Sequence, residues 1–208
     1  MRIRPCGDDA LRIEPDDPGA RHALAEHLRS LAVWKEVVPG RTGVTVQIDP
    51  VRHGLAQARA LLEKQVDCRI PGLSEAAGKR NLTAVFGGEA GPDLAALAAL
   101  NGMAPAEFVA RICGAELRVD LIGFTPGFAY LDGLDPALRA ARLATPRRRV
   151  AAGSIGLISG QVGLYVLPGP GGWPLVGRLC TPLFDAASAQ PFKLRVGELV
   201  RLVSVQPS

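Results

Sequence analysis

Polar side chains that could hold a small ligand are concentrated in the C-terminal half of the chain. Gln161 can both donate and accept hydrogen bonds, which suits an amide or a lactam, and Tyr130 and Tyr165 add hydroxyl groups. Arg147 or Arg178 could bind a carboxylate through two parallel hydrogen bonds. These residue types predict a pocket for a small molecule that carries an amide and a carboxylate, and they would also suit a proline-bearing peptide segment.

Three motifs could shape this pocket: GFTPGFAYL at 123–131, TPRRRVAAGS at 145–154 and PGGW at 170–173. Gly and Pro fix unusual loop paths, and exposed aromatic residues on such loops usually contact a ligand or a partner. An apolar surface near Trp173, completed by a second subunit, is therefore expected. The alternative is that these loops only turn corners and that Phe128, Trp173 and Phe184 belong to a core. The candidate binding residues are Phe124, Pro126, Gly127, Phe128, Tyr130, Arg147, Gly153, Ser154, Gln161, Tyr165, Gly171, Gly172, Trp173 and Arg178.

The charge of the motif region favours an anionic ligand. The whole chain carries a formal net charge of +4, with 48% hydrophobic and 21% charged residues, which is typical of a globular protein. Between residues 121 and 185 there are six Arg and three Asp. A net positive region attracts carboxylates or phosphates, although the run Arg147 to Arg149 could also be a solvated loop. The few aromatic residues do not favour a nucleic-acid surface.

Several familiar kinds of site are excluded. The nearest approach to a phosphate-binding P-loop, at 72–79, is one residue too long and is followed by Arg80 where Ser or Thr is needed. The segment 152–156 resembles a serine nucleophile elbow, but Ala152 replaces its first Gly and all three His lie upstream. His22 and His27 are five residues apart, which suits no metal site on a helix. No metal is expected, and the catalytic residues stay unassigned.

The ends and cysteines of the chain favour a cytoplasmic protein. No apolar run is long enough for a membrane helix, and residues 1–14 lack the apolar core of an export signal. The four Cys are scattered, as expected for reduced thiols rather than for disulfides.

The expected elements divide the chain into two domains, and the fold class is α+β. Apolar alternation predicts a β-β-α-β-β-α order, which favours a small α/β sandwich at residues 1–80. Its second helix is expected over 50–66, and residues 71–79 are interpreted as a linker. In residues 81–208, two short helices and many short strands with Gly/Pro turns predict a β-barrel or a folded sandwich.

The motif order resembles the B-type component of bacterial ATP-dependent 5-oxoprolinase, a family that includes the sporulation-kinase inhibitor proteins. GDDAL at 7–11, FGGEAGPDL at 86–94 and QVGLY at 161–165 extend the resemblance over nearly the whole chain. It is shared by the first subunit of allophanate hydrolase and by a domain of urea carboxylase. The resemblance implies a cyclophilin-like barrel, a C-type barrel subunit and an A-type subunit as partners, and ATP used through the assembled complex. It also implies 5-oxoproline, a lactam with a carboxylate, as substrate, and no activity of this chain alone.

Some positions depart from the family pattern. Ile112 and Leu117 stand where His and Tyr are usual, and Gly169, Pro174 and Leu179 replace other polar residues. A missing His removes the best candidate for proton transfer. Two alternatives therefore stay open: a regulator without catalytic activity that binds a histidine kinase, and a subunit of the urea carboxylase or allophanate hydrolase type.

Overall fold

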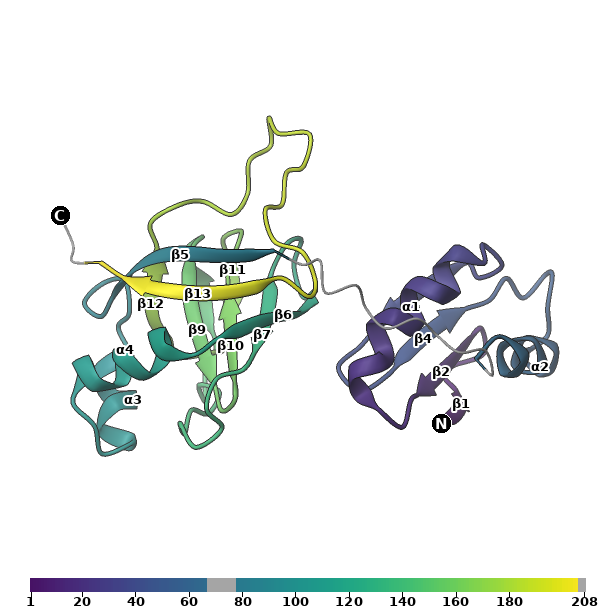
Figure 1. Cartoon of the computed structure of the whole chain (residues 1–208), viewed down its shortest axis with the longest axis horizontal. Coiled ribbons are helices and arrows are strands. Elements are labelled where there is room, and N and C mark those ends of the chain that lie inside the picture. Colours follow the sequence, from purple (N-terminus) through teal and green to yellow (C-terminus); the bar gives the residue numbers. More distant parts are fainter. Residues whose placement is uncertain (67–77, 206–208) are drawn as a thin grey trace. The chain divides into compact units, whose positions relative to one another are not determined.

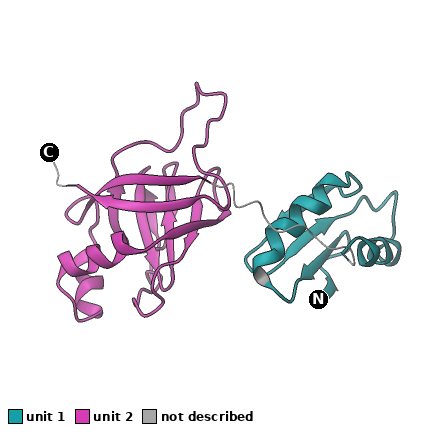
Figure 2. Ribbon diagram, viewed as in Figure 1, with its two compact units in different colours: residues 1–75 teal, residues 76–208 magenta. Residues whose placement is uncertain are grey.

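The computed structural model describes residues 1–66 and 78–205 and divides the chain into two compact units, residues 1–75 and 76–208 (Figure 2). Both units combine helices with β-sheet, and unit 2 contains a closed barrel, so the expected α+β fold class is confirmed. The domain boundary expected between residues 80 and 81 falls inside a strand, Lys79–Phe86. The linker expected at 71–79 lies outside the described residues except for its last two positions.

Unit 1 is a four-stranded antiparallel sheet with two helices (Figure 1). The strand order is β1-β2-β4-β3. The side chains of Leu11, Ile13, Val44 and Val46 alternate along β2 and β4 and are buried against the helices. This alternation is what the sequence predicts for a sheet with one covered face. The elements are β1 (Arg2–Pro5), β2 (Ala10–Glu14), the 3-10 helix η1 (Pro18–Ala20), α1 (Arg21–Ser30), β3 (Glu36–Pro39), β4 (Val44–Gln47) and α2 (Leu55–Val66).

The second helix of unit 1 begins later than the sequence predicts. The expected start is residue 50, but α2 starts at Leu55. Asp49 instead closes a turn, because its carbonyl oxygen accepts hydrogen bonds from the backbone N–H groups of Arg52 and His53, each at 3.0 Å. Gly54 follows this turn, and its carbonyl oxygen accepts from Ala58 in the first turn of the helix.

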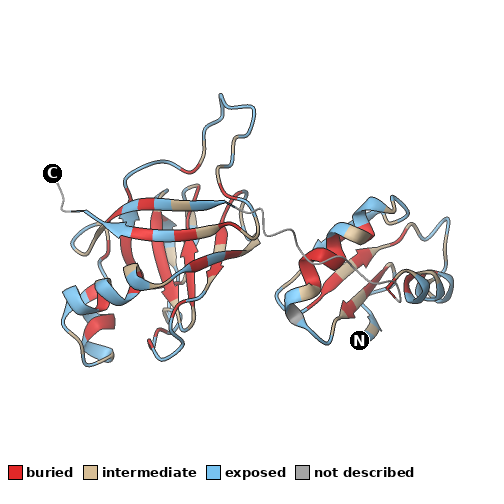
Figure 3. Cartoon of the chain, viewed as in Figure 1, coloured by how far each residue is buried: buried red, intermediate tan, exposed pale blue. Residues whose placement is uncertain are grey.

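Unit 2 is built around a barrel with the strand order β10-β7-β6-β13-β5-β12-β9. Most neighbours are antiparallel, but β13 pairs with β5 in parallel. Buried side chains line the strands of both units (Figure 3). A separate two-stranded sheet joins β8 and β11. The elements are β5 (Lys79–Phe86), α3 (Leu94–Leu100), α4 (Pro105–Gly114), β6 (Leu117–Ile122), β7 (Ala129–Asp132), β8 (Arg147–Val150), β9 (Ser154–Ile158), β10 (Gln161–Leu164), β11 (Gly169–Gly171), β12 (Leu175–Leu179) and β13 (Leu199–Ser204).

His22 on α1 makes the stability of unit 1 dependent on pH. The residue is 8% exposed, and burial, helped by the charges of Arg21 and Arg29, lowers the pKa of His22 from 6.5 to about 4. The folded state therefore holds the imidazole neutral, while the unfolded chain binds a proton near pH 6.5. The resulting stabilisation is present above pH 6.5 and is lost as the pH falls toward 4.

We expect the free energy of unfolding of unit 1 to fall by about 2 kcal/mol between pH 7 and pH 5. Urea unfolding can be followed through Trp34, which packs against the unit 1 core, in a Trp173→Phe background that silences the other Trp. The variant His22→Asn does not titrate in this range and should flatten the dependence. If the free energy of unfolding of that variant falls with pH as steeply as that of the wild type, His22 is not the source of the pH dependence.

Candidate functional site

Five aromatic rings from three motif segments, 123–131, 161–165 and 170–173, form a cluster in unit 2. Phe128 lies at the centre and is only 2% exposed. Its ring centroid is 4.7 Å from that of Tyr130, 4.9 Å from that of Tyr165 and 6.1 Å from that of Trp173, all in edge-to-face geometry. Such pairs are preferred over flat stacking because ring edges are positive and ring faces negative. The structure thus brings together the aromatic residues that the sequence singled out.

Two glycines in neighbouring strands make room for these rings. A Cβ atom on Gly163 of β10 would lie 2.8 Å from both Phe128 and Trp173, and one on Gly156 of β9 would lie 2.9 Å from the Trp173 Cβ. Gly156 and Gly163 are paired across the two strands. As a result Trp173 is 3% exposed. It belongs to the interior of unit 2 and not to the exposed surface expected near it.

The loop before β7 keeps one ring exposed. It is closed by hydrogen bonds between Gly123 and Phe128 and between Phe128 and Thr125, each at 3.0 Å. Phe124 is 62% exposed, has φ +73° and contacts Phe128 edge-on at 5.5 Å. A bulky residue in this left-handed region is strained, and such strain is concentrated at functional positions. Gly127, with φ +76°, lies directly against the ring of Phe192.

An ion pair joins the start of α3 to β8 beside the rings. Arg147 Nη2 donates to Asp93 Oδ1 at 2.8 Å, and Asp93 Oδ2 accepts the backbone N–H of Leu175 at 2.6 Å. Both side chains are mostly shielded from solvent. Arg147 Nη1 is buried and has no hydrogen-bond partner among the described residues. A buried N–H without an acceptor is costly, so an anionic ligand or a water at this point would be stabilised.

Sequence reasoning missed the part that Asp93 and Arg142 play here. Asp93 stands at the N-cap of α3, but its carboxylate binds Arg147 and the N–H of Leu175 instead of the helix. Arg142 contributes to the sequence argument only through its charge, yet its guanidinium carbon lies 5.8 Å from the centroid of the Trp173 ring. The FGGEAGPDL motif was the one signal that could have identified Asp93.

The two Tyr hydroxyls lie in the same electrostatic environment. Burial raises the pKa of Tyr165, opposed by a hydrogen bond from the backbone of Trp173 and by the charges of Arg142 and Arg147. Burial also raises the pKa of Tyr130, opposed by Arg142. Both phenols therefore stay protonated at neutral pH and can donate hydrogen bonds. The charge of Arg147 acts on the Tyr165 hydroxyl, so this cation lies near one of the two phenols.

The other predicted residues are more dispersed. Gln161 is buried, and its Nε2 donates to Asp132 Oδ1 at 2.6 Å, so its amide is already engaged. Ser154 is buried at the start of β9, where its carbonyl oxygen accepts the N–H of Tyr165 at 3.0 Å. Arg178 is exposed on β12 and packs beside Gly153. Pro126 is exposed in the Phe124 loop.

Two further glycines of the prediction border the ring cluster. Gly171 lies against the hydroxyl of Tyr165, so that a Cβ would clash with it. The carbonyl oxygen of Gly172 accepts the backbone N–H of Leu143 at 2.8 Å, which connects the PGGW motif to the segment that carries Arg142.

The departures at Ile112 and Leu117 have a structural explanation. Both side chains are fully buried in the main hydrophobic core of unit 2, with Phe108 and Val119. The ring cluster of Phe128 and Tyr165 is a separate group of buried residues. In this chain, the two positions therefore contribute to core packing.

Metal ligands and membrane-spanning helices are both absent from residues 1–66 and 78–205. No group of three or more His, Cys, Asp or Glu residues there could hold a metal ion. None of the helices in those ranges has the length and apolar character needed to cross a membrane.

Comparison with known proteins gives consistent matches over almost the whole chain. The family described as carboxyltransferase domain, subdomain C and D, matches residues 1–194. A protein of Escherichia coli O157:H7 named as the B-type component of 5-oxoprolinase is 36% identical, over 86% of this chain and 82% of its own. A protein of Haemophilus influenzae with the same name is 35% identical, over 98% of this chain and 97% of its own. The resemblance expected from the motifs is confirmed.

Solved structures agree with the fold. The structure of TTHA0988 superposes with a TM-score of 0.78 at 27% identity, over 96% of this chain and 40% of that one. The urea amidolyase of K. lactis superposes with a TM-score of 0.77 at 18% identity, over 98% of this chain and 15% of that one. At that identity the second match concerns the fold alone.

Proposed function

Because the chain belongs to the family of the carboxyltransferase domain, subdomain C and D, we propose that it is one subunit of an ATP-dependent hydrolase that opens the lactam ring of 5-oxoproline to give glutamate. The observation that carries this proposal is the match to two relatives named as the B-type component of 5-oxoprolinase, each at least 35% identical over more than four fifths of both chains. The fold match to urea amidolyase, at 18% identity, lends no support to urea as substrate.

The ring cluster supports a ligand of this kind. 5-Oxoproline is a flat, five-membered ring with a carboxylate on one side and a lactam carbonyl on the other. Arg147 Nη1 is a buried donor in need of an acceptor, and the substrate carboxylate would supply one. The hydroxyls of Tyr130 and Tyr165 can donate to a carbonyl oxygen, and Phe128 and Trp173 shield the cluster from water.

A lactam is chemically stable, which accounts for the need for ATP. Transfer of the terminal phosphoryl group of ATP to the lactam oxygen, with release of ADP, would make the ring carbon open to attack by water. The C–N bond then breaks, the nitrogen takes up a proton, and inorganic phosphate leaves to give glutamate. The relatives are named as one component of 5-oxoprolinase, and we therefore propose that this chain is inactive alone. We propose that ATP is used by the assembled complex, with a C-type barrel subunit and an A-type subunit as partners.

Reconstitution tests the proposal directly. The chain would be co-expressed with the candidate A-type and C-type subunits encoded beside its gene, and both phosphate release and glutamate formation would be measured. We expect ATP hydrolysis that depends on 5-oxoproline in the complex and none in the chain alone. An assembled complex without turnover on 5-oxoproline would contradict the proposal, and turnover on urea or allophanate would redirect it to those substrates. Recovery of a histidine kinase by the tagged chain would favour the regulator instead.

Phe124 is the residue that we expect to contact the partner barrel subunit. Its ring is exposed and contacts Phe128 of the ring cluster, and its backbone has a positive φ. We expect Phe124→Gly to weaken assembly at least about tenfold, as is typical of an aromatic anchor. Because Gly tolerates a positive φ, the stability of the isolated chain should change by no more than about 1 kcal/mol.

Analytical ultracentrifugation with the partner subunit measures the assembly, and urea unfolding measures the stability. Leu100→Ala is the matched control, since Leu100 is also a large exposed hydrophobic side chain of unit 2, lies on α3 and has no positive φ. Wild-type assembly of Phe124→Gly would exclude this contact.

A further inference from the structure

A second group of cationic side chains lies apart from the ring cluster, around the start of β5. Three cavities of unit 2 share Arg80 as a lining residue, with volumes of about 270, 370 and 150 Å³. The second of these, the 370 Å³ cavity, is lined by three cationic residues, Arg80, Lys193 and Arg195. Its one acidic residue is Glu198. The cavity therefore carries a surplus of positive charge.

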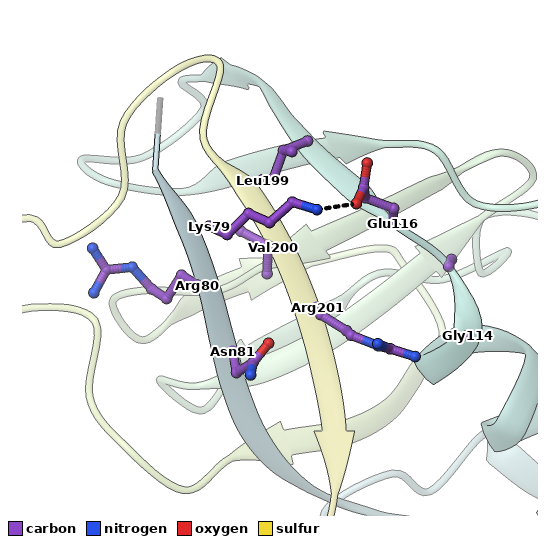
Figure 4. Close-up of a pocket in the computed structure, with 9 residues that line it drawn as sticks. Lys79, Arg80, Asn81, Gly114, Glu116, Leu199, Val200 and Arg201 are labelled. Carbon is purple, nitrogen blue, oxygen red and sulfur yellow. Dashed lines mark hydrogen bonds and ion pairs between the residues drawn. The ribbon is translucent and has the colours of Figure 1, made fainter. Parts of the chain in front are cut away.

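The 270 Å³ cavity has the same balance of charge, with Lys79, Arg80 and Arg201 against Glu116. Lys79 Nζ donates to Glu116 Oε2 at 2.9 Å, and the two side chains point toward one another (Figure 4). The pair also lowers the pKa of Glu116. Arg80 points away from Lys79 and Glu116 in the same view. Arg80 also lines the 370 Å³ cavity, where its partner is Glu198.

Arg80 is held in place by a buried carboxylate. Its Nε donates to Glu198 Oε1 at 2.6 Å, and Glu198 is 6% exposed. The other oxygen of Glu198 accepts the backbone N–H of Arg195 at 3.2 Å. Within the described ranges no partner is found for the two terminal nitrogens of Arg80. A guanidinium fixed through Nε, with its terminal nitrogens open, is preorganised to bind an oxyanion.

The remaining walls suit a phosphate-bearing ligand. Ser188 and Gln190 add polar side chains, and Gln190 accepts a hydrogen bond from Arg195. Phe192 lines the cavity with its ring, and the same ring packs directly on Gly127 of the Phe124 loop. An anion bound here would thus lie one side chain away from the loop of the candidate site.

We propose that the cavity between Arg80, Lys193 and Arg195 binds a multiply charged phosphate anion, either free or as the phosphate chain of a nucleotide. Three cations against one carboxylate favour a diphosphate or triphosphate over a single carboxylate, which one Arg would satisfy. The proposal is independent of the proposed activity, because binding is measured on the chain alone.

Isothermal titration of the full chain at low salt tests the proposal with four probes: inorganic phosphate, pyrophosphate, ATP and adenosine. We expect pyrophosphate and ATP to bind more tightly than phosphate, adenosine not to bind, and affinity to fall as salt rises. If pyrophosphate and ATP bind equally tightly, the site recognises the phosphate chain alone. If ATP binds more tightly than pyrophosphate, the protein also contacts the nucleoside. If neither anion binds, or if adenosine binds as well as ATP, the proposal is wrong.

The location is tested with Lys193→Gln combined with Arg195→Gln, which leaves the buried pair of Arg80 and Glu198 intact. We expect this double variant to lose roughly tenfold or more in affinity for pyrophosphate. The matched control is Arg148→Gln with Arg149→Gln, which removes the same charge from exposed positions of β8 and should bind as the wild type. Equal affinities of the two double variants would place the anion elsewhere. Far-UV circular dichroism of each variant confirms that the fold is retained.

Discussion

Replacing Trp173 with Ala is expected to lower the free energy of unfolding of unit 2 by about 3–5 kcal/mol, as is typical when a buried Trp is truncated. The ring packs against both Phe128 and Tyr130, at centroid distances of 6.1 and 5.7 Å. Because Gly156 and Gly163 beneath it have no side chains, the surrounding atoms cannot close the gap that the ring would leave. The measured loss of stability should therefore include the full free-energy cost of the cavity that the ring leaves.

Urea unfolding followed by far-UV circular dichroism measures this loss without relying on Trp fluorescence. Trp173→Phe keeps an aromatic ring in place and should cost markedly less than Trp173→Ala. Phe124→Ala is the control, since that ring is mostly exposed and its removal should change stability by only about 0.5 kcal/mol. If Trp173→Ala lowers the free energy of unfolding by as little as Phe124→Ala does, the Trp173 ring is not part of the packed interior.

The elements that could be predicted from the sequence are those with regular apolar spacing. Along β2 and β4 buried side chains alternate with half-buried ones from Leu11 and Val44 onward, and α4 begins at Pro105, a residue that favours the first turn of a helix. Strands β8 and β11 could not be predicted in this way. Two of the four residues of β8 are exposed Arg, and β11 is the tripeptide Gly169–Gly171. Their pairing with each other, and not their composition, makes them strands.

The candidate site was predictable in its residue types and less so in its geometry. Glycine spacing indicated shaped loops, but the burial of Trp173 depends on Gly156 and Gly163 lying side by side on paired strands. Register of that kind is a tertiary property. The contact between Asp93 and Arg147 joins residues 54 positions apart, and no local pattern reveals it. The 370 Å³ cavity likewise brings Arg80 together with a segment more than a hundred residues away.

Removing the Asp93 carboxylate should also lower the stability of unit 2 strongly, because this one group accepts hydrogen bonds from two partners. We expect Asp93→Ala to destabilise unit 2 by about 2–4 kcal/mol, since it leaves the Arg147 guanidinium and the Leu175 N–H without an acceptor. Glu107→Ala is the control. It breaks an exposed ion pair with Arg111 on α4, at 3.6 Å, and should cost no more than about 0.5 kcal/mol.

A double-mutant cycle separates the ion pair from the backbone hydrogen bond. If the pair is coupled as the geometry indicates, Asp93→Ala combined with Arg147→Met should cost less than the sum of the two single changes, by about 1 kcal/mol. In the reconstituted complex, Asp93→Asn should raise the KM for 5-oxoproline more than it lowers kcat, because the amide still accepts the N–H of Leu175 but no longer orients Arg147. Strict additivity in the cycle together with an unchanged KM would show that Asp93 holds the start of α3 to β12 and takes no part in positioning Arg147 for a substrate.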